Sequence, residues 1–333
     1  MLIEAVSEGS YWGAAQYTRM RLGRHGAVIL TDRFPGLSEM LSETLDRGSN
    51  PLQEEGALRA HIQKALGTPP PSGMEQTLLY RLARLWFRPR LFNVQRIPDR
   101  PCLFIGNHAL FGLDGLVIIP VLLEELGRYL RPMGDKFLFS DRRVADFLLR
   151  RGATMGHPDV ARALMEHDQD ILVFPGGAHE AVKPSHERYR LQWKERLGFV
   201  RLAAEYGYTI VPFGLVGPDE FYEYLLDGED IVDLLERAGL WRESLRRDVV
   251  PPLLRGALGT PIPRPQPCFL SFGEPVEAKT SRSGRARGVA TDRQLRAWRK
   301  QVAERIDAEI AAMLLAREQA RHEFGLLRRL ATL

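Results

Sequence analysis

Short apolar runs alternate with amphipathic stretches between about Pro101 and Gly217. The runs CLFIG, ATMG, DILVFPGG and YTIVPFG are apolar or β-branched and are typical of strands. Between them, residues 144–150, 158–167 and 193–206 carry apolar positions at helical spacing. This alternation predicts an α/β domain with a central, largely parallel sheet. Glycine or proline follows several strands directly, so ligand-binding loops are expected at the carboxyl ends of the strands.

A basic amphipathic stretch precedes this region and predicts a helix. Arginines occupy the face opposite its apolar stripe, a pattern typical of helices that lie in a membrane interface. A helix packed on the protein core, with its arginines in water, would show the same pattern. The apolar positions are Leu78, Leu79, Leu82, Leu85 and Trp86, and the basic ones are Arg81, Arg84 and Arg88.

A second amphipathic stretch lies near the other end of the chain. Thr291 and Gln294 have the spacing of a capping box. The following apolar positions recur at intervals of three and four residues, which predicts a long helix to about Leu330 that covers the core. These positions are Leu295, Trp298, Val302, Ile306, Ile310 and Met313. The basic run SRSGRARG just before this helix is typical of a solvated loop.

The chain divides by composition into four parts. Residues 1–73 carry mixed helical and loop signals and end in GTPPPSG, which breaks any helix and predicts a linker. Residues 74–100 hold the basic amphipathic segment, and residues 101–280 hold the strand-rich domain. Residues 281–333 hold the basic loop and the long amphipathic helix.

Composition and charge narrow the class of protein. With 44% hydrophobic and 26% charged residues the chain is globular, and a net charge of +4 does not require a nucleic-acid partner. Cys102 and Cys268 lie in apolar, strand-like runs and are expected to be buried and reduced, without a metal site. No secretory signal is expected, and the apolar run 116–123 is far shorter than the roughly 20 residues of a spanning helix. Membrane contact would therefore be peripheral.

The first candidate for chemistry is the segment GNHALFGLD, which directly follows the strand CLFIG. Its His108 can accept a proton at neutral pH, and Asp114 could hold the other ring nitrogen. On a straight helix, residues six apart lie about 120° from each other and would not meet. Gly112 can supply the turn that brings them together. The alternative is a histidine at a helix start and an unrelated surface aspartate.

The second candidate is the loop FPGGAHE after the strand DILV. The amides of Gly176 and Gly177 could donate to an oxyanion or to a polar lipid group. The alternative is that the two glycines only form a tight turn. Glu180 could bind an acceptor hydroxyl or cap the next segment. His179 and His186 lack the spacing of a zinc site, so no metal is expected. A third run, IVPFG, is a buried strand without chemistry of its own.

Together, the order and spacing of these three runs resemble the glycerolipid acyltransferase superfamily of the PlsC type. These segments are most similar to sequences of its diacylglycerol-acyltransferase-like branch, which includes phytyl ester synthases. They read GNHALFGLDG, FPGGAHEAVKPSHERYRLQWKERLGFVRLA and IVPFGLVGPDE. The similarity covers roughly residues 85–275. It implies that His108 and Asp114 are the catalytic pair and that Asn107 and the loop residues Phe174, Pro175, Gly176 and Gly177 contribute to substrate binding.

Three departures from the superfamily pattern bear on the acceptor. Five residues, not four, separate the His from the Asp, which resembles the neutral-lipid branch. Gly176 replaces the usual glutamate, and His179 stands where an arginine suited to phosphate would be. An uncharged acceptor is therefore favoured, although Arg188, Arg190 or Lys194 could still serve a phosphate. His157 stands where relatives often place a substrate-binding arginine, and either contacts the acceptor or is simply exposed.

The predicted function is transfer of a fatty acyl group to a lipid hydroxyl, without a cofactor. The donor would be acyl-CoA or acyl carrier protein, and the acceptor a mono- or diacylglycerol or a long-chain alcohol. The sequence has no GxSxG, Walker A or GxGxxG motif. The alternatives are a lysophospholipid acyltransferase, an inactive lipid-binding protein and an esterase. The expected location is the cytoplasmic face of a membrane, as a peripheral or monotopic protein.

Overall fold

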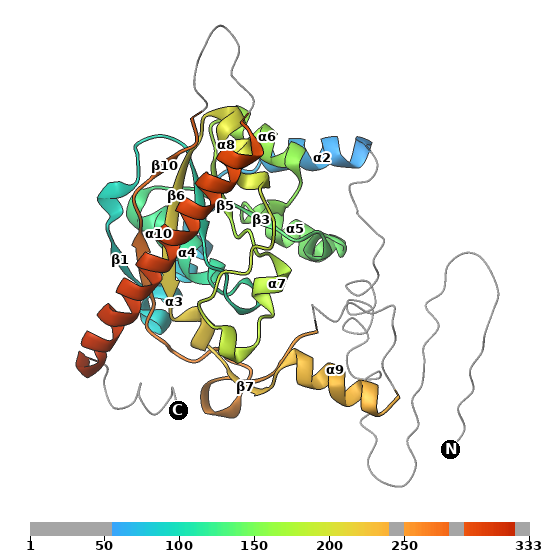
Figure 1. Cartoon of the computed structure of the whole chain (residues 1–333), viewed down its shortest axis with the longest axis vertical. Helices are drawn as coiled ribbons and strands as arrows, with labels where there is room; N and C mark the ends of the chain where they lie inside the picture. Colours follow the sequence, from blue (N-terminus) through green and yellow to red (C-terminus); the bar gives the residue numbers. More distant parts are fainter. Residues whose placement is uncertain (1–54, 240–249, 280–289, 324–333) are drawn as a thin grey trace, which may run out of the picture.

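A single mixed sheet organises the protein. The computed structural model describes residues 55–239, 250–279 and 290–323 (Figure 1). All four predicted strands are present, as β2 (Cys102–Gly106), β4 (Thr154–Met155), β5 (Asp170–Val173) and β6 (Thr209–Val216). Four further strands complete this sheet, namely β1 (Arg90–Phe92), β3 (Leu130–Gly134), β9 (Phe269–Phe272) and β10 (Val276–Glu277).

The sheet confirms the predicted fold class. Its order is β1-β9-β6-β2-β5-β3-β4, with β10 paired to β6. Strands β6, β2, β5, β3 and β4 are parallel, whereas β9 and β10 run antiparallel to β6. In the central register, Leu103 of β2 lies between Ile171 of β5 and Ile210 of β6. The carboxyl ends of β2 and β5 therefore lie side by side, and β6 runs past Gly106 to Val216.

Helices cover both faces of the sheet, because successive side chains of a strand point to opposite faces. Leu103 and Ile105 belong to one apolar cluster and Cys102 and Phe104 to the other. The first cluster is covered by α2 (Glu55–Leu66), α5 (Arg142–Arg150), α6 (Pro158–Glu166), α8 (Gly198–Tyr206) and α10 (Asp292–Gln319). The second is covered by α3 (Gly73–Phe87) and α4 (Gly115–Leu126). Both cysteines are buried and free.

The C-terminal helix α10 lies directly across β6 (Figure 1). A Cβ atom at Gly214 would lie only 2.6 Å from the backbone nitrogen of Ile310, so the missing side chain allows this close approach. The capping box of Thr291 and Gln294 is confirmed, and the predicted apolar positions face the core. The predicted extension to about Leu330 is wrong, because the α-helix ends at Gln319 and a 3₁₀ turn follows.

One other prediction needs correction. The helix predicted over 193–206 begins only at Gly198, because Lys194 adopts a left-handed backbone conformation (φ 48°) that an α-helix cannot continue. Across the predicted boundaries at 101 and 280, β1 joins the same sheet, and α2, α3 and α10 pack on it. Residues 1–54 and the run SRSGRARG lie outside the described residues.

The remaining elements are small and lie beside the sheet. A two-stranded antiparallel sheet of β7 (Glu223–Leu226) and β8 (Leu253–Arg255) adjoins α9 (Gly228–Arg237), and α7 (Ala178–Ala181) forms one turn after β5. The 3₁₀ turns are η1 (Val94–Arg96), η2 (Leu110–Gly112), η3 (Lys136–Phe139), η4 (Ser185–Glu187), η5 (Pro218–Glu220), η7 (Ala257–Gly259) and η8 (Arg321–Glu323). Within the described ranges, no helix is long and apolar enough to cross a bilayer.

Candidate active site

The His108–Asp114 pair forms as predicted. His108 follows the end of β2, and Asp114 is the N-cap residue of α4. Phe111 (φ 53°) and Gly112 (φ 72°) both adopt a left-handed backbone conformation. The segment from His108 to Asp114 therefore turns back on itself instead of continuing as a helix. The turn brings His108 Nδ1 to 2.6 Å from Asp114 Oδ2.

Asp114 is held rigidly by its surroundings. Its side chain is 1% exposed. Besides His108, it accepts hydrogen bonds from the backbone amides of Ala109 and Gly115, both at 2.7 Å. A carboxylate accepts hydrogen bonds, so it selects the tautomer of His108 with a proton on Nδ1. Nε2 then carries the free lone pair, and within the described residues it has no hydrogen-bond partner. This is the arrangement of a general base.

The electrostatics of His108 suit proton transfer. Burial by itself would lower the pKa of His108. The charge and hydrogen bond of Asp114, with a further contribution from the charge of Glu180, outweigh burial and raise the pKa above 6.5. The imidazole also stacks on Phe174, with ring centroids 4.2 Å apart and planes inclined by 10°. The stack fixes the ring plane, so Nε2 points in a defined direction.

The glycine loop lies against this base. Gly177 is left-handed (φ 55°), and its amide donates to the carbonyl of Phe174 at 2.9 Å. One of the two amides predicted to bind an oxyanion is therefore used inside the turn. The amide of Gly176 makes no such bond among the described residues. The carbonyl of Pro175 accepts from Arg196 at 2.6 Å, which places an exposed cation beside the loop.

Three buried charged residues adjoin the base. Glu180, Lys183 and Asp219 are 0%, 2% and 3% exposed. Lys183 Nζ lies 2.8 Å from Asp219 Oδ2 and donates to the carbonyl of His108, also at 2.8 Å. Sequence reasoning missed Lys183 and Asp219. For Lys183, the only sequence feature that could have indicated a role was its position one helical turn after Glu180. No local sequence feature indicated a role for Asp219.

Sequence comparison identifies the family. A family model described as diacylglycerol acyltransferase matches residues 101–283, just over half of the 333 residues. The chain belongs to the diacylglycerol acyltransferase family. The resemblance inferred from the three motifs is thereby confirmed.

Two relatives from a plant agree with this membership. The chain is 31% identical over 244 residues to phytyl ester synthase 1 of Arabidopsis thaliana, covering 67% of this chain and 34% of the relative. It is 30% identical over 203 residues to phytyl ester synthase 2, covering 56% and 29%. The chain thus spans about a third of these relatives. A crystal structure of the Thermotoga maritima PlsC acyltransferase aligns with TM-score 0.44 and 15% identity, over 84% of this chain and 89% of that one.

Asn107 and His179, both predicted to bind substrate, lie in different surroundings. Asn107 is 2% exposed, and its amide group donates to and accepts from the backbone of Leu215, at 2.9 and 2.8 Å. It therefore joins β2 to β6, which gives this side chain a structural role. His179 is half-buried on α7 beside the glycine loop.

Two other predicted contacts have local roles. His157 is the N-cap of α6, with Nδ1 accepting from the amide of Asp159 at 3.2 Å. Its strand β4 is separated from β2 by β5 and β3. The guanidinium of Arg188 lies 5.3 Å from the ring centroid of Tyr224 on β7. Among the described residues, His108 forms its side-chain hydrogen bond with Asp114 and with neither of these two residues.

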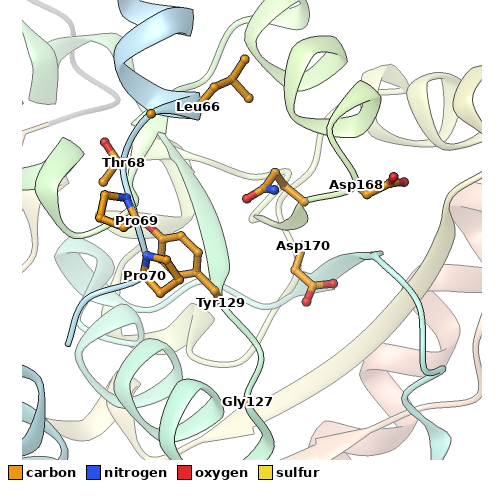
Figure 2. A pocket seen from close by; sticks show the side chains of 10 residues that line it. Leu66, Thr68, Pro69, Pro70, Gly127, Tyr129, Asp168 and Asp170 are labelled. Atoms are coloured by element: carbon orange, nitrogen blue, oxygen red, sulfur yellow. The ribbon is translucent and has the colours of Figure 1, made fainter.

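A surface cavity of about 460 Å³ lies at the opposite end of the sheet (Figure 2). It is formed by the linker residues 66–70 and by the segments that precede β3 and β5, including Tyr129 and Asp170. Parallel α/β sheets bind ligands at the carboxyl ends of their strands, whereas this cavity lies at the amino ends. None of the residues predicted for chemistry lines it.

Proposed function

We propose that this protein transfers a fatty acyl group from a thioester to the hydroxyl of a neutral lipid. The observation that carries the proposal is the 2.6 Å contact between His108 Nδ1 and Asp114 Oδ2, which leaves Nε2 free to act as a base. Membership of the diacylglycerol acyltransferase family supports it. The names of the phytyl ester synthases support formation of an ester.

The reaction follows from this geometry. His108 Nε2 takes the proton of the acceptor hydroxyl as its oxygen attacks the thioester carbonyl. Asp114 stabilises the imidazolium that forms, and the amide of Gly176 donates to the oxyanion. The carbon–sulfur bond of the tetrahedral intermediate then breaks, and the imidazolium returns its proton to the thiolate. The products are the ester and the free thiol, and no acyl-enzyme is required.

Loop chemistry supports an uncharged acceptor and an anionic donor. Glycine at 176 and histidine at 179 leave the loop without the arginine of a phosphate clamp. Hydrophobic side chains lie beside the base, with Phe111 51% and Leu116 52% exposed. The exposed Arg196 next to Pro175 suits the phosphates of acyl-CoA or an acidic acyl carrier protein.

An apolar face of α3 supports contact with a membrane surface. Leu78, Leu82, Leu85 and Trp86 are 55%, 51%, 70% and 37% exposed. The helix instead packs on the domain through Gln76, Ala83 and Phe87. Trp86 Nε1 donates to the carbonyl of Pro263, beside a loop with exposed Leu258 and Ile262. We propose that this face lies in the interface on the cytoplasmic side of a membrane, as a peripheral or monotopic contact.

Vesicle sedimentation tests the membrane proposal. Anionic vesicles should retain the wild-type protein, and replacing Leu82 and Leu85 together by glutamate should release most of it, because burial and charge attraction are both lost. The matched control is Leu315→Glu, which changes a leucine that is 61% exposed on α10. Equal retention of all three proteins would refute a role for α3.

An acceptor panel tests the function. Purified protein, one radiolabelled acyl-CoA and matched detergent are combined with diacylglycerol, a fatty alcohol, lysophosphatidate or no acceptor, and the products are separated by lipid chromatography. We expect ester formation on the neutral acceptors and none with His108→Ala. A preference of about tenfold or more in kcat/KM for lysophosphatidate, roughly 1.4 kcal/mol, would contradict the neutral acceptor. Hydrolysis unaffected by any acceptor would indicate an esterase.

A further inference from the structure

The side chain of Glu180 packs directly against the backbone of Gly176. A Cβ atom built on Gly176 would lie 2.2 Å from Cγ and Cδ of Glu180 and 2.4 Å from its Oε2. The carboxyl group thus fills the volume in which a side chain at 176 would begin. Only glycine fits beneath it, and the loop that carries Phe174 is held against Glu180.

One oxygen of this carboxyl group is buried without a partner. Oε1 accepts from the backbone amide of Gln192 at 2.7 Å, whereas Oε2 has no hydrogen-bond partner among the described residues. A buried carboxylate oxygen without a partner is costly and needs a compensating charge. Lys183, three residues along the chain, contributes an opposite charge but directs its bonds at Asp219 and at the carbonyl of His108.

We propose that Glu180 and Lys183 are positioning residues for the base. Lys183, neutralised by Asp219, fixes the backbone of His108, and Glu180 is a second carboxylate that stabilises the imidazolium formed when His108 takes the acceptor proton. This role rests on the proposed acyl transfer. It gives the base two acidic neighbours, with Asp114 bonded to the ring and Glu180 acting through space.

Charges of both signs surround His108 and Glu180, and for His108 the acidic neighbours raise its pKa while Lys183 lowers it. His108 faces Asp114 from α4, Glu180 from α7 and Lys183 from the segment after it. Glu180 in turn faces His108, Lys183 and Asp219. Burial raises the pKa of Glu180 above its ordinary value, the charge of Asp219 acts in the same direction, and the Gln192 amide, Lys183 and His108 offset only part of this rise. The charge of Glu180 raises the pKa of His108, so an uncharged residue at 180 should let that pKa fall.

The direct test is an NMR titration of the histidine ring signals, which requires no activity. The His108 signal is assigned by its loss in His108→Ala. In Glu180→Gln, which keeps the shape and removes the charge, the midpoint of His108 should move to lower pH. The control, Glu195→Gln, removes a carboxylate that is 79% exposed and only 15 positions away, and should leave the midpoint in place. An unchanged midpoint in Glu180→Gln, or an equal fall in both variants, would overturn the proposal.

Kinetics supply the second readout. Glu180→Gln should lower kcat about tenfold or more at an unchanged KM, with the acid limb of the pH profile displaced to lower pH and partial recovery in Glu180→Asp. A purely structural Glu180 would lower the melting temperature and leave the pH profile unmoved, which would also overturn the proposal. A wild type without transfer activity would refute the proposed function alone, because the titration still reports on Glu180.

A pair of variants at Gly176 separates an effect on folding from an effect on the position of the base. Gly176→Ala should lower the melting temperature, since the new Cβ meets the carboxyl group. Adding Glu180→Ala removes that contact and should restore the melting temperature without restoring kcat. Restoration of both would contradict a positioning role.

Discussion

Breaking the buried ion pair below His108 should be one of the most damaging single changes in this protein. Lys183→Met keeps the length and apolar stem of the side chain and removes its charge. The side chains of Lys183 and Asp219 are 1% and 2% exposed, so no solvent can replace the lost partner. Removing one partner of a buried pair typically costs about 3–5 kcal/mol, because the other charge remains buried.

The surroundings of Asp219 place the cost within this range. The amide of Tyr189 still donates to Oδ2 at 2.7 Å, which offsets part of the loss. Oδ1 is buried and has no partner among the described residues, so the aspartate has little further compensation. The carbonyl of His108 also loses its donor. We expect about 3 kcal/mol, a change of more than a hundredfold in the unfolding equilibrium.

Urea unfolding followed by tryptophan fluorescence measures this cost. The control is Lys300→Met, because Lys300 is 77% exposed and its contact with Glu304 is a solvated surface pair, and this change should leave the midpoint unmoved. Adding Asp219→Asn to Lys183→Met should recover part of the stability, since the orphaned charge is gone. A cost below about 1 kcal/mol for Lys183→Met would refute the reasoning. So would a double variant less stable than Lys183→Met alone.

Three further outcomes are expected. Asp114→Asn should reduce kcat by about 10²–10⁴ with little change in KM, because the tautomer and charge partner of His108 are lost; steady-state kinetics would show otherwise if both constants stayed near wild type. Gly214→Ala should cost about 1–3 kcal/mol in urea unfolding, because its Cβ would lie 2.6 Å from the backbone of Ile310, and wild-type stability would disprove the close approach. Burial, with the charges of Lys64 and His157, lowers the pKa of His61, whose Nε2 accepts from the amide of Met155. As the pH falls, the imidazole of His61 is therefore protonated in the unfolded chain before it is protonated in the folded protein. Its contribution to the free energy of unfolding should be fully present above about pH 6.5 and be lost progressively below it. A His61→Gln variant with the same pH dependence as wild type in thermal melts would contradict this.

Local pattern determined the elements and the reactive pair. Apolar runs of a few residues predicted β2, β4, β5 and β6, because a strand covered on both faces of the sheet buries side chains on both faces. The face of α10 followed from its period. The pairing of His108 with Asp114 was predictable because both lie in one short segment with a glycine between them.

Tertiary structure decided what depends on distant segments. Lys183 donates to the carbonyl of His108, which is 75 positions away in sequence, and Asn107 pairs with Leu215, which is 108 positions away. No local sequence pattern could predict either hydrogen bond. The helical period of α3 was equally compatible with a buried or an exposed apolar stripe. Periodicity shows which residues share a face of a helix, but not what that face contacts. In the structure Ala83 is buried and Leu82 is exposed to solvent. Most of all, a carboxylate could be placed in the space of Gly176 only by folding the chain, because the sequence records the absence of a side chain there but not what fills it.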